Sequence, residues 1–236
     1  MKVAVFGTGY VGLVTGVCLA EKGQQVLCVD IDENKIEKLK LGESPIYEPG
    51  LNELLKKNIA AGRILFSTNV HEAVNFSTVL MIAVGTPPAE DGSADLSHVL
   101  KVAETIAQNM TSYRLILNKS TVPVGTHLQV QNCVAEVLRA RNSALEVEVA
   151  SNPEFLREGC AIEDCLFPAR IIVGTKSAEA ARLLRELYRP FIEQGVKYVV
   201  MDPLSSEMTK YAANSMLAAR ISLMNEFARL CEKVGA

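Results

Sequence analysis

Short runs of apolar and β-branched residues recur along the chain and predict the strands of a buried sheet. These runs occupy residues 2–6, 25–30, 78–84, 114–118, 146–150, 170–174 and 197–201. Runs that are apolar throughout are typical of parallel strands, because helices cover both faces of a parallel sheet. Helical patterns alternate with them over residues 11–22, 32–41, 96–109, 126–140 and 177–189. The alternation predicts an α/β fold with a doubly wound, mainly parallel sheet.

The last segment differs from the rest of the chain. Asp202 and Pro203 form a favourable helix start, with the aspartate as N-cap and the proline in the first turn. Neither proline nor glycine follows until Gly235. The segment therefore predicts one helix of roughly 50 Å, at 1.5 Å per residue, which would connect this unit to another. We divide the chain into a domain over residues 1–202 and the start of a long connecting helix over residues 203–236.

The composition argues against several classes of protein. The net charge of −3 and the pI near 5.7 are atypical of nucleic-acid binders, which usually carry a basic face. No apolar run reaches membrane-spanning length, so we expect no membrane partner. The six cysteines and three histidines show no CxxC pair, and neither a metal site nor a disulfide framework is expected. The start "MKVAVFGTG" shows no signal-peptide pattern, so a cytoplasmic location is expected.

A glycine motif, "GTGYVG" at residues 7–12, follows the first predicted strand and opens the first predicted helix. In a Rossmann-like unit the first glycine permits a tight turn, the second lets the backbone approach a pyrophosphate, and the third lets helix and strand pack closely. The helix N-terminus adds free N–H groups and a positive dipole end. We expect the motif to contact a dinucleotide through Gly7, Gly9, Tyr10, Val11 and Gly12.

An acidic residue, Asp30, ends the second predicted strand and favours NAD over NADP. Its carboxylate can accept the ribose hydroxyls and would repel a 2′-phosphate. Lys35 lies five residues further on and is placed to reach the adenosine ribose. The structural alternatives are a helix-capping aspartate and an ordinary surface lysine.

Two further patterns carry pairs of polar residues. In "MTKYAANSML" Lys210 and Asn214 are four apart, so they share one face of the predicted long helix. In "NPEFLREG" Glu154 and Glu158 are also four apart, and one helical turn between them would let their environments push their pKa values apart. A snorkelling lysine and an exposed acidic helix start are the structural alternatives.

Six segments together resemble the UDP-glucose/GDP-mannose dehydrogenase family, most strongly its UDP-glucose-oxidising members. They are "FGTGYVGLVTGVCLAEKG", "SPIYEPGLNELL", "AVGTPP", "KSTVPVGT", "NPEFLREG" and "EMTKYAANSMLA". The likeness runs from Met1 to Ala236. It implies oxidation of the C6 alcohol of UDP-glucose to the carboxylate of UDP-glucuronate, with two NAD molecules and a cysteine thioester, in the synthesis of nucleotide sugars for polysaccharides.

The resemblance also assigns roles to residues. Thr121 would hold a catalytic water and touch the nicotinamide half of NAD, although a helix cap is the structural alternative for Ser120 and Thr121. Glu154 would position water with support from Glu158, while Lys210 and Asn214 would stabilise charge at C6. Thr86, Thr121 and Glu154 would contact NAD. The sugar-nucleotide pocket would be formed by Glu154, Phe155, Leu156, Arg157, Lys210 and Asn214. We interpret Tyr47 and Glu48, in the proline-pinned loop, as structural.

The family's nucleophilic cysteine lies in a glycine-rich segment beyond the long helix, and this chain ends before it. None of the six cysteines has that setting, and the C-terminal sugar-nucleotide domain is absent too. We therefore expect an NAD-binding half that does not complete turnover alone. An apolar stripe through Met208, Ala212, Met216 and Leu223 predicts a homodimer.

Alternative functions stay open at this point. A GDP-mannose or other UDP-sugar 6-dehydrogenase would share most of these motifs. A β-hydroxyacid-type dehydrogenase also pairs a Rossmann domain with a later Lys and Asn, but "SPIYEPGL" and "NPEFLREG" argue against it. A non-catalytic NAD-binding module would have no need of the polar residues at 121, 154, 158, 210 and 214.

Overall fold

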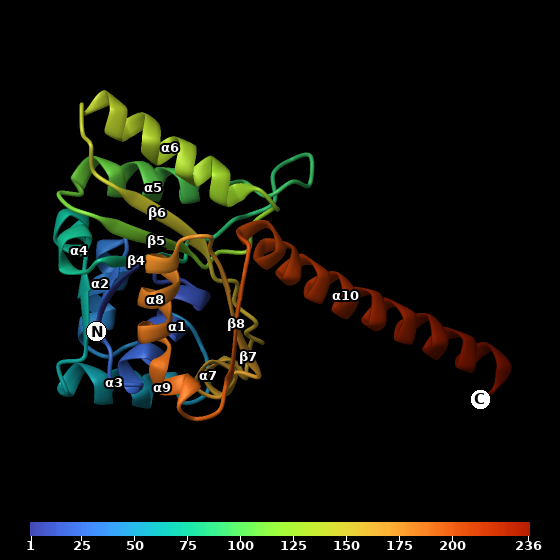
Figure 1. The fold of residues 1–236 in the computed structure, drawn as a ribbon. Helices are drawn as coiled ribbons and strands as arrows, with labels where there is room; N and C mark the ends of the chain where they lie inside the picture. Colours follow the sequence, from blue (N-terminus) through green and yellow to red (C-terminus); the bar gives the residue numbers. More distant parts are fainter.

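The sheet of the computed structural model, which describes residues 1–236, has eight strands in the order β3-β2-β1-β4-β5-β6-β7-β8 (Figure 1). The strands are β1 (Lys2–Phe6), β2 (Gln25–Val29), β3 (Ile64–Ser67), β4 (Val79–Ile82), β5 (Arg114–Asn118), β6 (Val147–Ser151), β7 (Arg170–Gly174) and β8 (Lys197–Met201). The helices are α1 (Tyr10–Glu21), α2 (Glu33–Lys40), α3 (Leu51–Ala60), α4 (Val70–Phe76), α5 (Ser97–Asn109), α6 (Thr126–Ala140), α7 (Ala161–Leu166), α8 (Ala178–Leu187), α9 (Arg189–Ile192) and α10 (Pro203–Val234).

Neighbouring strands are parallel except at one place. β6 and β7 run antiparallel and are joined through Ser151 and Gly174 alone. Along the chain, strand order proceeds outward from β1 to β3 and then restarts beside β1 with β4. Ligands of doubly wound folds bind at such a switch point, outside the carboxyl ends of the strands. The topology therefore places a binding site where the loops after β1 and β4 meet.

Two apolar cores cover the two faces of the sheet. Val3 and Val5 belong to a cluster of 31 buried residues shared with α1, α3, α7 and α8, whereas Ala4 and Phe6 belong to a cluster of 19 shared with α4, α5 and α6. Successive residues of a strand point to opposite faces, which is why β1 feeds both cores. Burial on both faces explains the continuous apolar runs of the sequence.

The predicted α/β architecture is confirmed, and the predicted strands agree with the structure to within two residues at each end. The prediction omitted β3, α3, α4, α7 and α9. β3 has only four residues, of which Leu65 is exposed, so its pattern is too short to signal a buried strand. α4 and α7, with seven and six residues, are similarly short for a helical period to show.

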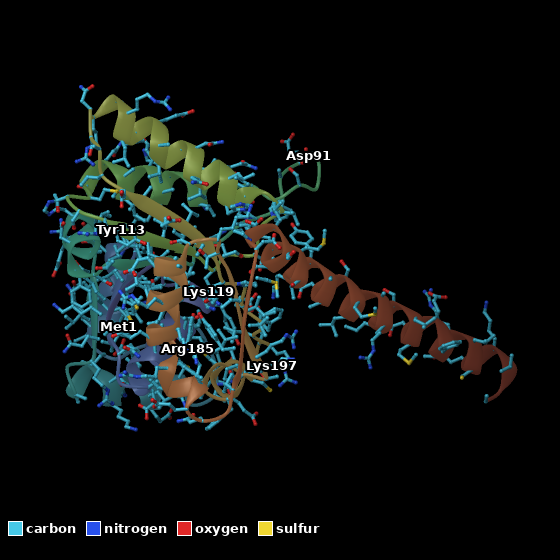
Figure 2. The ribbon with its side chains drawn as sticks, in the orientation of Figure 1. Met1, Asp91, Tyr113, Lys119, Arg185 and Lys197 are labelled. Atoms are coloured by element: carbon cyan, nitrogen blue, oxygen red, sulfur yellow. The ribbon has the colours of Figure 1, made fainter.

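The long helix α10 starts as predicted, because the Asp202 side chain accepts a hydrogen bond from the Ser205 amide at 3.0 Å. It continues for 32 residues and ends at Gly235, whose φ of 73° is left-handed. Only its first turns pack on the domain. Ser206 lies against Gly174, where an added Cβ would come within 2.5 Å of the serine Cβ. Beyond them the helix projects away from the body and its side chains stand free (Figures 1 and 2). No helix of the chain is both long and apolar enough to cross a membrane.

Glu207 ties the root of α10 to the N-terminus of α6. Its carboxylate accepts hydrogen bonds from the Gly125 amide at 2.6 Å and from the His127 amide at 2.8 Å. The side chain is fully buried. The interpretation of Ser120 and Thr121 as caps of this helix is wrong, because Gly125 is the N-cap and the Ser120 hydroxyl donates instead to the Val84 carbonyl at 2.7 Å.

Replacing Glu207 by alanine should destabilise the chain. The change leaves two buried amides of α6 without an acceptor, and we expect a loss of about 2–4 kcal/mol in the free energy of unfolding. Urea unfolding followed by circular dichroism measures this loss. Glu226→Ala, on the exposed part of the same helix, should change the free energy of unfolding little. Equal stability of both variants would contradict the anchoring role.

Candidate functional site

The glycine motif adopts the geometry that a dinucleotide loop requires. Gly7 has a φ of +101°, and an added Cβ there would lie 2.7 Å from the Ala83 carbonyl oxygen. A Cβ on Gly12 would lie 2.0 Å from the Gly7 oxygen, so only glycine permits α1 to pack this closely on β1. Gly9 has open space above it and caps α1 without a side-chain acceptor. The first amides of α1 are therefore free to receive an anionic group.

A cavity of about 510 Å³ extends from this loop along the ends of β2 and β4. Its lining includes Gly7, Gly9, Asp30, Ile31, Lys35 and His98. A mostly apolar cleft with a few polar groups, bordered by a glycine loop and a helix N-terminus, fits the nucleoside and pyrophosphate of a dinucleotide.

Asp30 places a carboxylate in the lining of this cavity, at the end of β2. Its Oδ2 accepts from the Thr8 amide at 2.8 Å, the Thr8 hydroxyl at 2.6 Å and the Lys35 ammonium at 3.2 Å. Its Oδ1 accepts only from the Asp32 amide, at 3.2 Å. Burial disfavours the charged form, but these hydrogen bonds outweigh it and lower the pKa of Asp30 below its ordinary value. The carboxylate is therefore ionised at neutral pH, with Oδ1 the freer oxygen.

A second polar cluster lies where the segments after β4, β5 and β6 meet the root of α10. Glu154 is its centre: Oε1 lies 2.6 Å from the Lys210 ammonium and accepts from the Thr121 hydroxyl at 3.3 Å. Its Oε2 accepts from the Leu156 amide at 2.6 Å. The Thr86 hydroxyl donates to the Thr121 carbonyl at 2.7 Å, which joins the loops after β4 and β5. Four residues named from separate motifs are thus brought together.

The ion pair between Lys210 and Glu154 is buried, with side-chain exposures of 7% and 9%. The Phe155 ring flanks it, 5.6 Å from the Lys210 ammonium and 4.5 Å from the Arg170 guanidinium. Burial in such surroundings strengthens the field of each charge. An ammonium held this way can stabilise an oxyanion that develops beside it.

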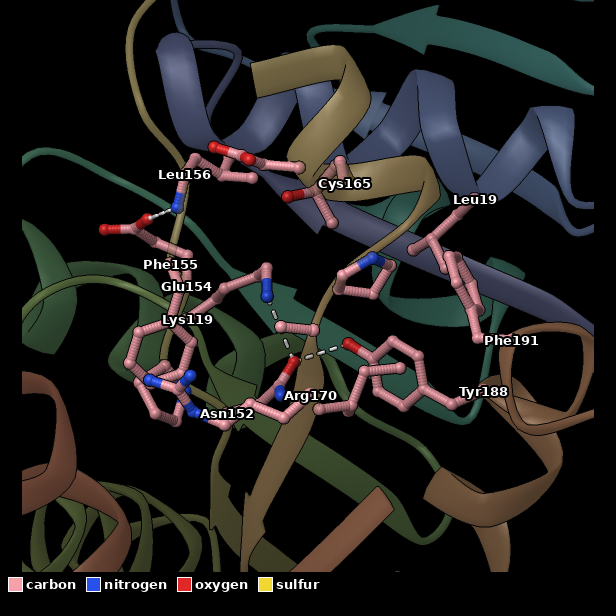
Figure 3. Close-up of a pocket in the computed structure, with 16 residues that line it drawn as sticks. Leu19, Lys119, Asn152, Glu154, Phe155, Leu156, Cys165, Arg170, Tyr188 and Phe191 are labelled. Carbon is pink, nitrogen blue, oxygen red and sulfur yellow. Dashed lines mark hydrogen bonds between the residues drawn. The ribbon is translucent and has the colours of Figure 1, made fainter. Parts of the chain in front are cut away.

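A smaller cavity of about 180 Å³ is lined in part by Glu154, Phe155 and Leu156 (Figure 3). Lys119 points into it and donates to the Asn152 side chain at 3.2 Å, and the Tyr188 hydroxyl donates to the same oxygen. Burial lowers the pKa of Lys119. Cys165 also lines this cavity.

Three of the residues predicted for catalysis or for sugar-nucleotide binding have side chains outside this cluster. The expectation that Glu154 and Glu158 lie one helical turn apart is wrong, because residues 152–157 are irregular and α7 begins only at Ala161. Glu158 and Asn214 are exposed, and the Arg157 side chain is paired with Asp164 at 2.6 Å.

Comparison with known proteins identifies the family. Residues 1–192 match the NAD binding domain of the UDP-glucose/GDP-mannose dehydrogenase family, and residues 204–236 match its central domain. The chain belongs to the UDP-glucose/GDP-mannose dehydrogenase family. It therefore carries the NAD-binding domain of these oxidoreductases, with NAD as the cofactor.

Relatives of known activity resemble the chain along its whole length. UDP-glucose 6-dehydrogenase TuaD of Bacillus subtilis is 48% identical over 235 residues, which are 100% of this chain and 50% of that protein. The UDP-glucose dehydrogenase structure from Pyrobaculum islandicum has a TM-score of 0.89 at 40% identity, covering 96% of this chain and 52% of that one. A ternary complex of GDP-mannose dehydrogenase from Pseudomonas aeruginosa has a TM-score of 0.91 at 34% identity, and the match covers 100% of this chain and 54% of that one. The chain spans about half the length of these relatives.

Several residues that hold this site together could not be predicted from local sequence patterns. Thr8 lies inside the glycine motif, but its bond to Asp30 crosses 22 residues of chain. Glu207 precedes Lys210 by three residues, and its partners lie about 80 residues earlier. Only the folded chain brings such partners together.

Replacing Asp30 by asparagine should reduce the preference for NAD. The amide keeps the shape but removes the negative charge that would repel a 2′-phosphate, so NAD should bind about tenfold more weakly while NADP weakens less. Fluorescence titration with each dinucleotide measures the ratio of the two dissociation constants. Glu33→Gln, at the exposed neighbouring helix start, serves as the matched control. An unchanged ratio would show that Asp30 does not select the cofactor.

Proposed function

We propose that this chain is the NAD-binding half of an NAD-dependent UDP-glucose 6-dehydrogenase. The reaction converts the C6 alcohol of UDP-glucose to the carboxylate of UDP-glucuronate in two hydride transfers. The observation that carries the proposal is the buried cluster of Lys210, Glu154 and Thr121 beside the family's NAD-binding loop. The relatives described above favour UDP-glucose over GDP-mannose, because UDP-glucose 6-dehydrogenase TuaD is 48% identical to this chain and the GDP-mannose dehydrogenase structure is 34% identical.

The proposed chemistry assigns one task to each member of the cluster. The Lys210 ammonium stabilises negative charge on the C6 oxygen, first as alkoxide and later as oxyanion. Glu154 holds that ammonium in place through Oε1 and, together with the Thr121 hydroxyl, orients a water toward the reacting carbon. NAD, when bound, accepts the hydride from C6. Thr86 supports Thr121 by its bond to the Thr121 carbonyl.

The remaining proposed site residues surround this centre. Phe155, Leu156 and Arg157 continue from Glu154 and would present their backbone to the sugar nucleotide. Glu158 and Asn214 have exposed side chains without hydrogen-bond partners in the chain, so both are free to bind a ligand. Gly7, Gly9, Tyr10, Val11, Gly12, Asp30 and Lys35 would hold NAD. The domain would extend over residues 1–202, and α10 would be the start of the central helix.

The proposal includes a homodimer built on α10. Large apolar side chains at Met216, Leu223, Phe227, Leu230 and Val234 are half exposed or more. Their spacings of seven, four, three and four residues follow a heptad, the pattern that packs two helices together. An apolar stripe of this extent needs a cover in solution, and we assign it to a second copy of the chain. The six free cysteines fit a reducing compartment, and we propose the cytoplasm, with the product serving polysaccharide synthesis.

Calorimetry should detect NAD binding to this chain and then UDP-glucose binding to the NAD complex. Lys210→Met removes the ammonium and should weaken UDP-glucose by about tenfold or more, with NAD affinity nearly unchanged. Lys233→Met, exposed on the same helix, is the control. An assay of the chain with both ligands should show no sustained NADH, because none of its six cysteines has the glycine-rich setting of the family's nucleophile. Failure to bind UDP-glucose, or NADH production at an enzyme's rate, would overturn the proposal.

Light scattering should give the mass of a dimer for this chain. Leu230→Glu places a charge in the centre of the apolar stripe and should shift the mass to that of a monomer, since an unpaired charge is costly in a dry interface. Arg229→Glu, beside it on the exposed helix, should leave the dimer intact. A monomeric wild-type chain would rule out the second copy as the cover of α10.

A further inference from the structure

A buried carboxylate outside the cluster joins the dinucleotide loop to the proposed substrate segment. Glu48 lies in the proline-pinned loop between α2 and α3 and is 5% exposed. Its Oε2 accepts from the Tyr10 hydroxyl and from the Gly159 amide, the latter at 2.8 Å. Its Oε1 accepts from the Ala161 amide, also at 2.8 Å. Every donor around Glu48 thus points at a carboxylate oxygen.

This arrangement requires an ionised carboxylate. A carboxylate accepts on both oxygens, whereas an amide of the same shape has one acceptor and one donor. Burial opposes the charge, but the hydrogen bonds from Tyr10 and from the amides of Gly159, Ala161 and Ile162 outweigh it, so the pKa of Glu48 lies below its ordinary value. A glutamine there would turn its NH₂ group toward at least one buried donor.

The two ends of this connection belong to different parts of the proposed site. Tyr10 is the first residue of α1, inside the glycine motif that faces the cofactor. Gly159 directly follows the segment 154–158 and has a φ of +85°, so the chain turns sharply there. The Gly159 amide also lies 3.1 Å from the Tyr10 hydroxyl. Residues 149 positions apart in sequence therefore share one hydrogen-bonded group.

We propose that Glu48 is a positioning residue, which fixes the segment 154–158 against the first turn of α1 and so sets the affinity for the sugar nucleotide. Lys210 and the Leu156 amide hold the start of this segment through Glu154. Glu48 holds its end. NAD, bound through the backbone of the glycine motif and Asp30, does not depend on the Glu48 bonds. The identity of the sugar nucleotide rests on the function proposed above.

The test measures three quantities in the same variants: the affinity for NAD, the affinity for UDP-glucose, and the hydrogen exchange of the Gly159 and Ala161 amides. In Glu48→Gln, UDP-glucose should bind the NAD complex about tenfold more weakly, while the NAD dissociation constant changes less than about twofold. Amide hydrogen exchange at Gly159 and Ala161 should accelerate by at least about tenfold. Glu43→Gln, exposed in the same loop, should change none of these quantities.

Tyr10→Phe keeps the carboxylate and its two amide bonds but removes the hydrogen bond between Glu48 and α1. It should weaken UDP-glucose by a smaller factor than Glu48→Gln. Unchanged UDP-glucose affinity and exchange in Glu48→Gln would overturn the inference. Equal weakening of both ligands would also overturn it, because that result describes a general loss of structure. If the wild-type chain binds no UDP-glucose, the proposed function fails, and the exchange of the two amides alone decides whether Glu48 holds the segment.

Discussion

The buried ion pair between Lys210 and Glu154 is the contact on which the arrangement of the site depends. Glu154 emerges after β6, in the middle of the sheet, whereas Lys210 lies on a helix that leaves the sheet at its end. Two opposite charges out of water tolerate little separation, because each would otherwise be left without a partner in a weakly polar interior. The pair therefore holds α10 against the strand ends. Thr121 and the Leu156 amide complete the bonding of the same carboxylate, so the loops after β5 and β6 share its position.

Three buried carboxylates connect segments that are distant in sequence. Glu154 joins the loop after β6 to α10, Glu207 joins α10 to the start of α6, and Glu48 joins the loop before α3 to the start of α7. Each accepts backbone N–H groups that would otherwise be unpaired at a loop or a helix start. Part of the acidic excess of the composition therefore stabilises the fold, because several carboxylates are buried in the domain and hydrogen-bonded to its backbone.

Local patterns were enough to predict seven of the eight strands, the glycine loop and the start and end of α10. Continuous apolar runs, a glycine motif between strand and helix, and an Asp-Pro start are all features of a few neighbouring residues. The antiparallel pairing of β6 with β7 and the partners of Glu48 and Glu207 were not predictable, because they depend on residues far apart in the chain. The spacing of Glu154 and Glu158 led to the wrong prediction of a shared helical face, for a related reason. A four-residue period implies a shared face only inside a helix, and residues 152–157 are irregular.

The length and continuity of α10 make it a lever. After Pro203 at its first position, α10 contains no proline or glycine at which it could bend, and it packs on the domain only at its root. A rod of this length, about 48 Å at 1.5 Å per residue, moves its far end by about 0.8 Å for each degree of tilt at the root. Lys210 lies close to that pivot. A small tilt of α10 beside the ion pair is therefore magnified at the outer end of the helix. Any molecule that packs on the outer end is in this way mechanically linked to the position of Lys210.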